Sequence, residues 1–166
     1  MNYRVANGLI TVHAHSSVHD KRTTWNRVTG EIAADPETLA TQGATGRFDV
    51  DMTAFDAGDF LSNRKLRKDF DLEAHPRARF ELRRVHSVER KGARFTATAE
   101  GVLDWRGHKL DIVLAGEGML DDKAAQARAS FALDIRKLGL SAPRFLMFKM
   151  EDEVTVEVAL SAQVAA

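Results

Sequence analysis

The chain has 166 residues, its 24 lysines and arginines are balanced by 24 aspartates and glutamates, and it contains no cysteine. This length fits one domain, residues 1–166, which buries roughly 70% of its unfolded surface and needs no disulfide or metal to fold. Zero net charge argues against a general nucleic-acid binder. The absence of cysteine excludes thiol redox chemistry and cysteine nucleophiles.

The first residues alternate between apolar and polar side chains, which is typical of β-strands. We expect strands at 3–6 and 9–18, and the Asn7-Gly8 dipeptide between them predicts a hairpin turn. No apolar run has the length of a signal-peptide core, and none approaches the roughly 18 residues of a membrane span. The expectation is a cytoplasmic protein without a transmembrane segment, or a periplasmic one if a signal has been trimmed.

Alternating strands are next expected at 28–32 and 46–53, and one short helix follows them. Asp56 is placed to be its N-cap, and Phe55 and Phe60 occupy the two positions of a hydrophobic staple. The helix carries a basic stretch at 64–68. This stretch indicates either an anchor for an anionic lipid head group or a solvated face balanced by acidic neighbours.

Alternation continues from residue 78 to the end of the chain. The expected strands are 78–88, 93–105, 109–120, 125–135 and 153–164, and the turns between most of them are tight. About eight strands in such a succession predict an all-β fold with one short helix between strands, either an up-and-down barrel or a sandwich.

The inward face of this barrel is expected to be small at one end and large at the other. Strand 93–105 places Phe, Ala, Ala, Gly, Leu and Trp on that face, and strand 125–135 places three Ala before Phe, Leu and Ile. Small residues on several strands favour a ligand cavity, whereas a tapered and fully packed barrel gives the same pattern without one. The predicted lining consists of Phe95, Leu103, Trp105, Leu110, Ile112, Leu114, Phe131, Leu133 and Phe148, with Arg144 at the rim.

Three histidines near the N-terminus are the candidates for metal chemistry. His13, His15 and His19 follow one another at spacings of two and four, and imidazoles on one strand face can bind zinc, copper or haem iron. Their parity is opposite to that of Ile10 and Val12, which places them on the outside of the barrel. We therefore predict no metal site and no cofactor. No catalytic arrangement of side chains stands out, so an enzyme is the less favoured reading.

Several short stretches, in order along most of the chain, resemble the YceI family of lipocalin-like polyisoprenoid-binding proteins. They are AHSSV at 14–18, GEI at 30–32 before an Asp-Pro turn, NRKLRKDFD at 63–71, AHPRARF at 74–80, GVL at 101–103, WRGH at 105–108, and the segments 131–138 and 151–160. The segment after Ser17 is shorter than the corresponding hairpin of the family. The resemblance implies an extended lipocalin-like antiparallel β-barrel of about eight strands, a long isoprenoid ligand such as a polyprenyl lipid or a quinone tail, and a homodimer.

The predicted function is thus non-enzymatic binding or carriage of an apolar ligand, an isoprenoid lipid or a quinone-type chain, inside the barrel. Two alternatives remain open from the sequence. One is a metal- or haem-binding protein or enzyme that uses the N-terminal histidines. The other is a dimeric structural or stress protein whose barrel is filled.

Overall fold

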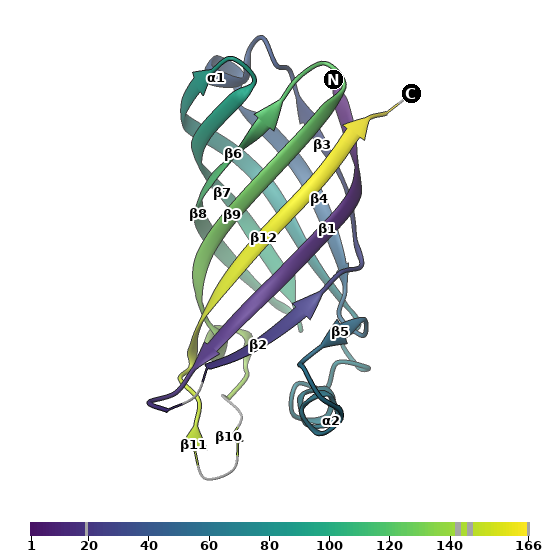
Figure 1. Ribbon diagram of the computed structural model, residues 1–166, viewed down its shortest axis with the longest axis vertical. Helices are drawn as coiled ribbons and strands as arrows, with labels where there is room; N and C mark the ends of the chain where they lie inside the picture. The colour runs from purple at the N-terminus through teal and green to yellow at the C-terminus, as the bar shows by residue number, and fades with distance from the viewer. Residues whose placement is uncertain (19, 142–143, 146–147, 166) are drawn as a thin grey trace.

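A computed structural model describes residues 1–18, 20–141, 144–145 and 148–165 of the chain. Within these residues, eight long antiparallel strands close into a barrel (Figure 1), which confirms the predicted fold. Their order around the barrel is β1 (Asn2–His15), β3 (Val28–Ala34), β4 (Ala44–Asp51), β6 (Arg77–Lys91), β7 (Arg94–Trp105), β8 (His108–Leu120), β9 (Ala124–Asp134) and β12 (Glu153–Val164), which pairs again with β1.

The strands from β6 onward form where the sequence alternates. In β12, Val154 and Val156 are buried while Glu153 and Glu157 are exposed, so one face meets the interior and the other meets water. The turn between β7 and β8 is formed by Arg106 and Gly107, whose φ angles are 57° and 77°. A two-residue hairpin needs this left-handed geometry.

Strand β1 differs from its prediction. The expected hairpin at Asn7-Gly8 is absent, because β1 runs straight through it with an irregularity between Val5 and Asn7 opposite β12. A Cβ atom at Gly8 would lie 2.6 Å from the Cβ atom of Val28, so close packing requires glycine there. The dipeptide therefore marks a close approach of two strands rather than a turn.

The other edge of β1 is shared between two partners. Its first residues pair with β3, from Asn2 to Arg4, and residues 10–15 pair with β2 (Asp20–Trp25). Residues 5–9 lie between these two ladders and have no register partner on this side among the described strands. A short strand, β5 (Phe55–Asp56), extends the sheet beyond β2.

Two register shifts occur in β6; the first reverses the inward and outward parity of the strand and the second restores it. They lie between Leu82 and Arg84 and between His86 and Glu89, each consistent with a β-bulge. The alternation of the sequence suggested that Arg84 and His86 point inward with Leu82. Instead, Arg84 is exposed, and His86 faces Glu100 with 3.8 Å between Nε2 and Oε1.

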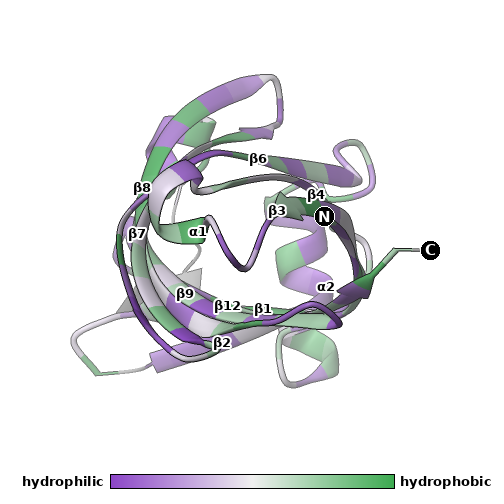
Figure 2. Ribbon diagram, turned by 90° about the horizontal axis from the view of Figure 1, so that it is seen from above, coloured by the Kyte–Doolittle hydropathy of each residue, from purple (hydrophilic) through white to green (hydrophobic). Residues whose placement is uncertain are grey.

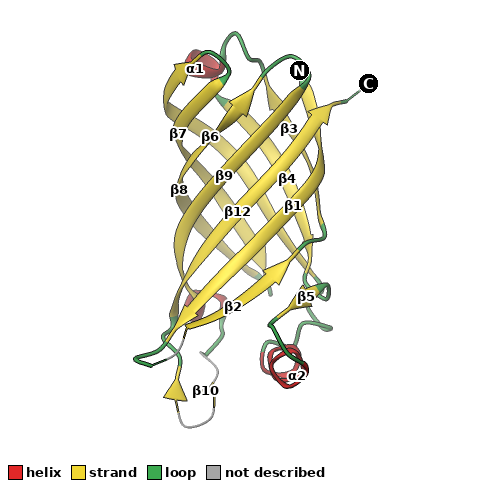
Figure 3. Ribbon diagram, in the orientation of Figure 1, coloured by secondary structure: helices red, strands yellow, loops and turns green. Residues whose placement is uncertain are grey.

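The described residues contain two α-helices where one was predicted (Figure 3). The unexpected one is a single turn, α1 (Leu39–Gln42), whereas α2 (Phe60–Asp69) is the predicted helix. The N-cap of α2 is Asp59 rather than Asp56, since its carboxylate accepts a hydrogen bond from the Ser62 amide at 2.8 Å. Phe60 consequently starts the helix on its exposed side and forms no staple. A 3-10 helix, η1 (Ile135–Leu138), follows β9.

The buried core is divided between the two ends of the barrel. Viewed along the barrel, α1 lies across one end, while α2 lies at the other (Figures 1 and 2). The cluster at the α1 end contains Tyr3, Ala34, Leu39, Leu120, Ala125 and Ala162. The larger cluster at the α2 end is built around Trp25, Leu66, Leu72, Trp105, Ile135, Leu138, Met150, Val154 and Val156.

Candidate ligand site in the barrel interior

Between the two clusters, the inward face of the barrel is apolar but incompletely buried. Leu82, Leu114, Val158 and Leu160 point inward, and each is only half-buried. Their strands are hydrogen-bonded on both edges. A solvent molecule could therefore contact these side chains only from inside the barrel. The interior thus contains room next to hydrocarbon side chains, which is the environment of apolar ligand sites.

The open space lies beside β8 and β9. Ala97, Gly116, Ala129 and Val158 form one row across β7, β8, β9 and β12. The nearest atoms to a Cβ atom built at Gly116 are the Arg128 carbonyl oxygen at 3.1 Å and the Ala129 Cβ at 3.5 Å. Both belong to the neighbouring strand, so the closest neighbours of this Cβ position come from β9 and not from the opposite wall.

The opposite wall is filled by two aromatic rings. Phe48 and Phe80 stack with 6.5 Å between ring centroids. A Cβ atom at Gly30 would lie 2.8 Å from the Phe48 ring, and one at Gly101 would lie 2.4 Å from the Phe80 ring. These two glycines make room for aromatic side chains rather than for a ligand. Gly116 differs from these two glycines, because no aromatic ring is among the nearest neighbours of its Cβ position.

The α1 end of the interior is closed by hydrogen bonds as well as by packing. The Tyr3 hydroxyl donates to the Asp121 carbonyl oxygen at 2.6 Å, and burial raises the pKa of this phenol. Arg90 donates through its guanidinium to the carbonyl oxygens of Pro36 and Leu120, the second at 3.1 Å. Arg90 thereby ties the loop that leads into α1 to the end of β8.

The α2 end is closed by two tryptophans. Trp25 donates from Nε1 to the Met52 carbonyl oxygen at 3.1 Å, and Trp105 donates in the same way to His75 at 3.0 Å. The Arg106 guanidinium adds a hydrogen bond to the Phe70 carbonyl oxygen at 2.6 Å. These bonds fix the chain around α2 across the end of the barrel.

The predicted lining residues divide among these regions. Leu114 lies in the middle, Phe95 packs on the α1-end cluster, and Trp105 is a member of the α2-end cluster. Ile112 is buried on β8. Four others pack against the α2-end cluster: Leu103, Leu110, Phe131 and Leu133. Arg144 and Phe148 belong to the short pair β10 (Arg144–Phe145) and β11 (Phe148–Lys149), and their side chains lie outside the described part.

The predicted lining omitted Leu82, Val158 and Leu160, which face the same space. The alternation of β12 was visible in the sequence and places Val158 and Leu160 on the same face as the buried Val154 and Val156. The sequence did not reveal which strands lie across the barrel from one another.

His13 and His15 lie on the outer surface, as their parity predicted. His13 Nε2 is 3.3 Å from a Glu157 carboxylate oxygen, and His15 Nδ1 is 2.7 Å from one of Asp20. His19 is outside the described residues. Within the described residues, no three histidine, aspartate or glutamate side chains converge in a way that could hold a metal ion.

Two hollows, of about 900 Å³ and 840 Å³, are separate from the interior. Each follows one row of residues across neighbouring strands and includes the outward-facing residues on both sides of that row. This is the geometry of a groove between pleats on the outside of a sheet. The first is flanked by charged side chains: Glu89, Lys91, Arg94, Glu117 and Arg128. Neither groove offers an enclosed apolar site.

Comparison with known proteins agrees with this architecture. The family model described as a YceI-like domain matches residues 5–162, nearly the whole chain. The chain belongs to the YceI family. No curated protein sequence matches it. The part of this YceI-family chain that the structure describes has no helix long and apolar enough to cross a bilayer.

Solved structures share the fold at low sequence identity. A polyisoprenoid-binding domain from Saccharophagus degradans, implicated in plant cell wall breakdown, superimposes with a TM-score of 0.78 at 11% identity and covers 98% of both chains. BcnA from Burkholderia cenocepacia gives 0.73 at 15% identity, over 93% of this chain and 95% of the other. The YceI protein of Campylobacter jejuni gives 0.73 at 13% identity, over 92% and 90%.

Proposed function

We propose that this YceI-family chain binds a long apolar ligand, an isoprenoid lipid or a quinone-type chain, inside the barrel, and that it carries this ligand without chemical change. The observation that carries the proposal is the row Ala97, Gly116, Ala129 and Val158, which faces unfilled space between two packed ends. The polyisoprenoid-binding description of the Saccharophagus degradans domain supports the choice of ligand class.

The chemistry of the interior supports a hydrocarbon rather than a charged molecule. The half-buried inward residues of the middle region are apolar, among them Leu82, Leu114, Val158 and Leu160. Such a wall recognises a ligand by removing its apolar surface from water, at about 25 cal/mol per Å² before the costs of ordering the chain. A charged group placed there would lose its hydration without gaining a partner.

Native mass spectrometry tests this proposal directly. We expect protein purified from cells to carry a lipid, or the apoprotein to take up one added long-tailed isoprenoid quinone per barrel. A short-chain quinone with the same head group serves as the control, and it should bind more weakly because it buries less hydrocarbon. An apoprotein that takes up neither molecule would refute the proposal. The same spectra report whether the protein is the homodimer that we propose.

A further inference from the structure

Helix α2 exposes large apolar side chains on the side turned away from the barrel. Phe60 and Leu61 are 76% and 73% exposed, the highest values for large apolar side chains in the described part of the chain. The opposite side of the helix buries Ser62 and Leu66. Two adjacent, largely exposed apolar side chains at one end of a molecule are typical of a contact surface.

Basic residues continue this exposed side. Arg64 lies one turn beyond Phe60, and Lys68 lies two turns beyond Leu61, so the four side chains share one face. Arg64 and Lys68 are both exposed. Among the described residues, neither has a carboxylate within ion-pair distance. We call these four residues the α2 face.

Three of the nearby acidic groups are paired with other cations, whereas Asp56 and Asp71 have no ion-pair partner among the described residues. Asp59 lies 3.3 Å from Lys21 Nζ, and its carboxylate also caps the helix. The other ion pairs of this region are Lys65–Asp69 at 2.9 Å and Arg67–Glu73 at 3.9 Å. The α2 face itself carries two positive charges, those of Arg64 and Lys68, and no acidic residue.

We propose that the α2 face docks on the surface of a bilayer that contains anionic phospholipid. Phe60 and Leu61 would enter the boundary between head groups and acyl chains, while Arg64 and Lys68 contact lipid phosphates. This combination of apolar and basic residues is the one by which interfacial helices bind membranes. Because α2 lies at the end of the barrel opposite the chain termini (Figure 1), docking directs that end toward the bilayer.

Vesicle sedimentation tests the proposal with the full chain. We expect the protein to bind vesicles of equal parts phosphatidylcholine and phosphatidylglycerol much better than vesicles of phosphatidylcholine alone, and added salt should weaken the binding. The double variant Arg64→Gln/Lys68→Gln should bind about 30-fold more weakly, which corresponds to about 1 kcal/mol per charge. The variant Phe60→Ser/Leu61→Ser should bind the anionic vesicles about tenfold more weakly, or weaker still.

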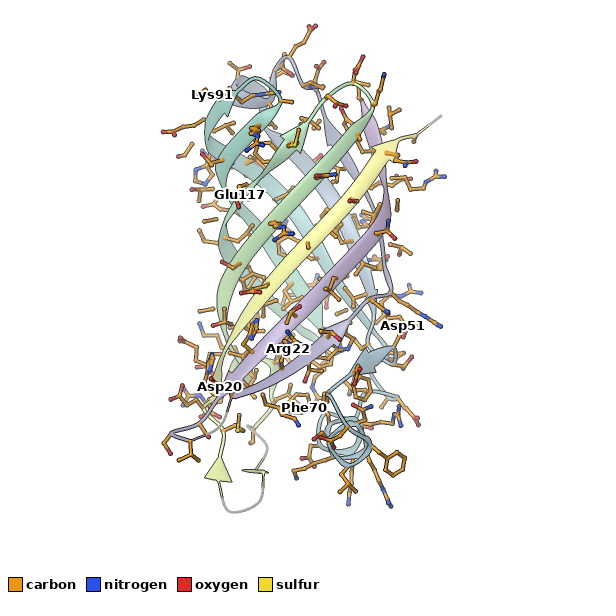
Figure 4. The ribbon with its side chains drawn as sticks, viewed as in Figure 1. Asp20, Arg22, Asp51, Phe70, Lys91 and Glu117 are labelled. Atoms are coloured by element: carbon orange, nitrogen blue, oxygen red, sulfur yellow. The ribbon has the colours of Figure 1, made fainter. Side chains whose placement is uncertain are left out.

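The matched control removes two charges far from α2. Arg84→Gln/Lys91→Gln has the same change in net charge, both side chains are exposed, and Lys91 lies at the opposite end of the barrel from Phe70 and α2 (Figure 4). This control should bind vesicles like the wild type. All variants change surface side chains, so an unchanged urea midpoint confirms that each is folded.

Three results would overturn the proposal: no preference for anionic vesicles, equal loss in the control, or a protein dimer that Phe60→Ser/Leu61→Ser abolishes while vesicle binding persists. The last result would assign the face to a second copy of the chain. The measurement uses no quinone or polyprenyl ligand, so it is independent of the proposed function.

Discussion

Replacing Ala129 by leucine asks whether the barrel interior is hollow. Ala129 lies on β9 beside Gly116, on the wall that faces unfilled space. Leucine adds three carbon atoms, each worth about 0.8 kcal/mol when buried without strain. In an empty interior, Ala129→Leu should therefore raise the free energy of unfolding by up to about 2 kcal/mol. In a packed interior, the same atoms should lower it by about 1–3 kcal/mol.

Urea unfolding distinguishes these outcomes, because their signs are opposite. With a slope of about 2 kcal/mol/M, a gain of about 2 kcal/mol moves the midpoint up by about 1 M. Ala132→Leu is the control, since Ala132 lies on the same strand with its side chain exposed, and it should change stability by less than about 0.5 kcal/mol. Ala129→Leu should also weaken quinone uptake. A destabilised Ala129→Leu protein would refute the unfilled space beside Ala129.

Three further predictions concern the ends of the barrel. Arg90→Met should lower the free energy of unfolding by about 2–3 kcal/mol, because it removes charged hydrogen bonds and leaves the Pro36 carbonyl without its donor. Urea unfolding measures this decrease, and amide hydrogen exchange should become faster, most of all at α1. Trp105→Phe should lower the free energy of unfolding by about 1–3 kcal/mol, because the His75 carbonyl loses its partner; thermal unfolding measures this, and an unchanged midpoint would contradict it. Tyr3 is the single tyrosine of the chain, and because its pKa is raised in the folded protein, the unfolded chain loses the phenol proton at a lower pH. The free energy of unfolding should therefore be constant below about pH 10 and decrease above it. The tyrosinate absorbance of the folded protein should appear at a pH above the ordinary pKa of 10.0.

The sequence predicted the parts of the barrel in which one face is buried and the other is wet. Residues 153–164 were predicted as a strand with the bounds that β12 has, because each inward Val or Leu is followed by a polar or small residue. The observed two-residue turn at Arg106 and Gly107 lies between the strands expected at 93–105 and 109–120, where a tight turn was predicted. In such strands, local pattern and tertiary environment agree.

The differences arise where contacts distant in sequence decide the local structure. Asn7-Gly8 favours a turn locally, but Gly8 is needed for the close approach of Val28, and the strand continues. Asp56 and Asp59 are both acceptable N-caps, and the structure uses Asp56 to accept the Gly58 amide instead. Contacts distant in sequence also decide how the interior is filled. The small inward residues could be identified in the sequence, but the sequence did not reveal that Phe48 and Phe80 fill the space at the glycines of the opposite wall.

The change of partner along β1 has a mechanical consequence for the barrel. Val5 and residues 7–9 have partners in the ladder with β12, but among the described strands they have none in register on the other edge, between the ladders with β3 and β2. Parting the wall along this line breaks fewer cooperative hydrogen bonds than parting it anywhere between β6 and β9, where the ladders are long. The barrel wall is therefore easiest to open along residues 5–9 of β1. Separating the strands there would enlarge the interior, while Trp105 and Arg90 keep both ends packed.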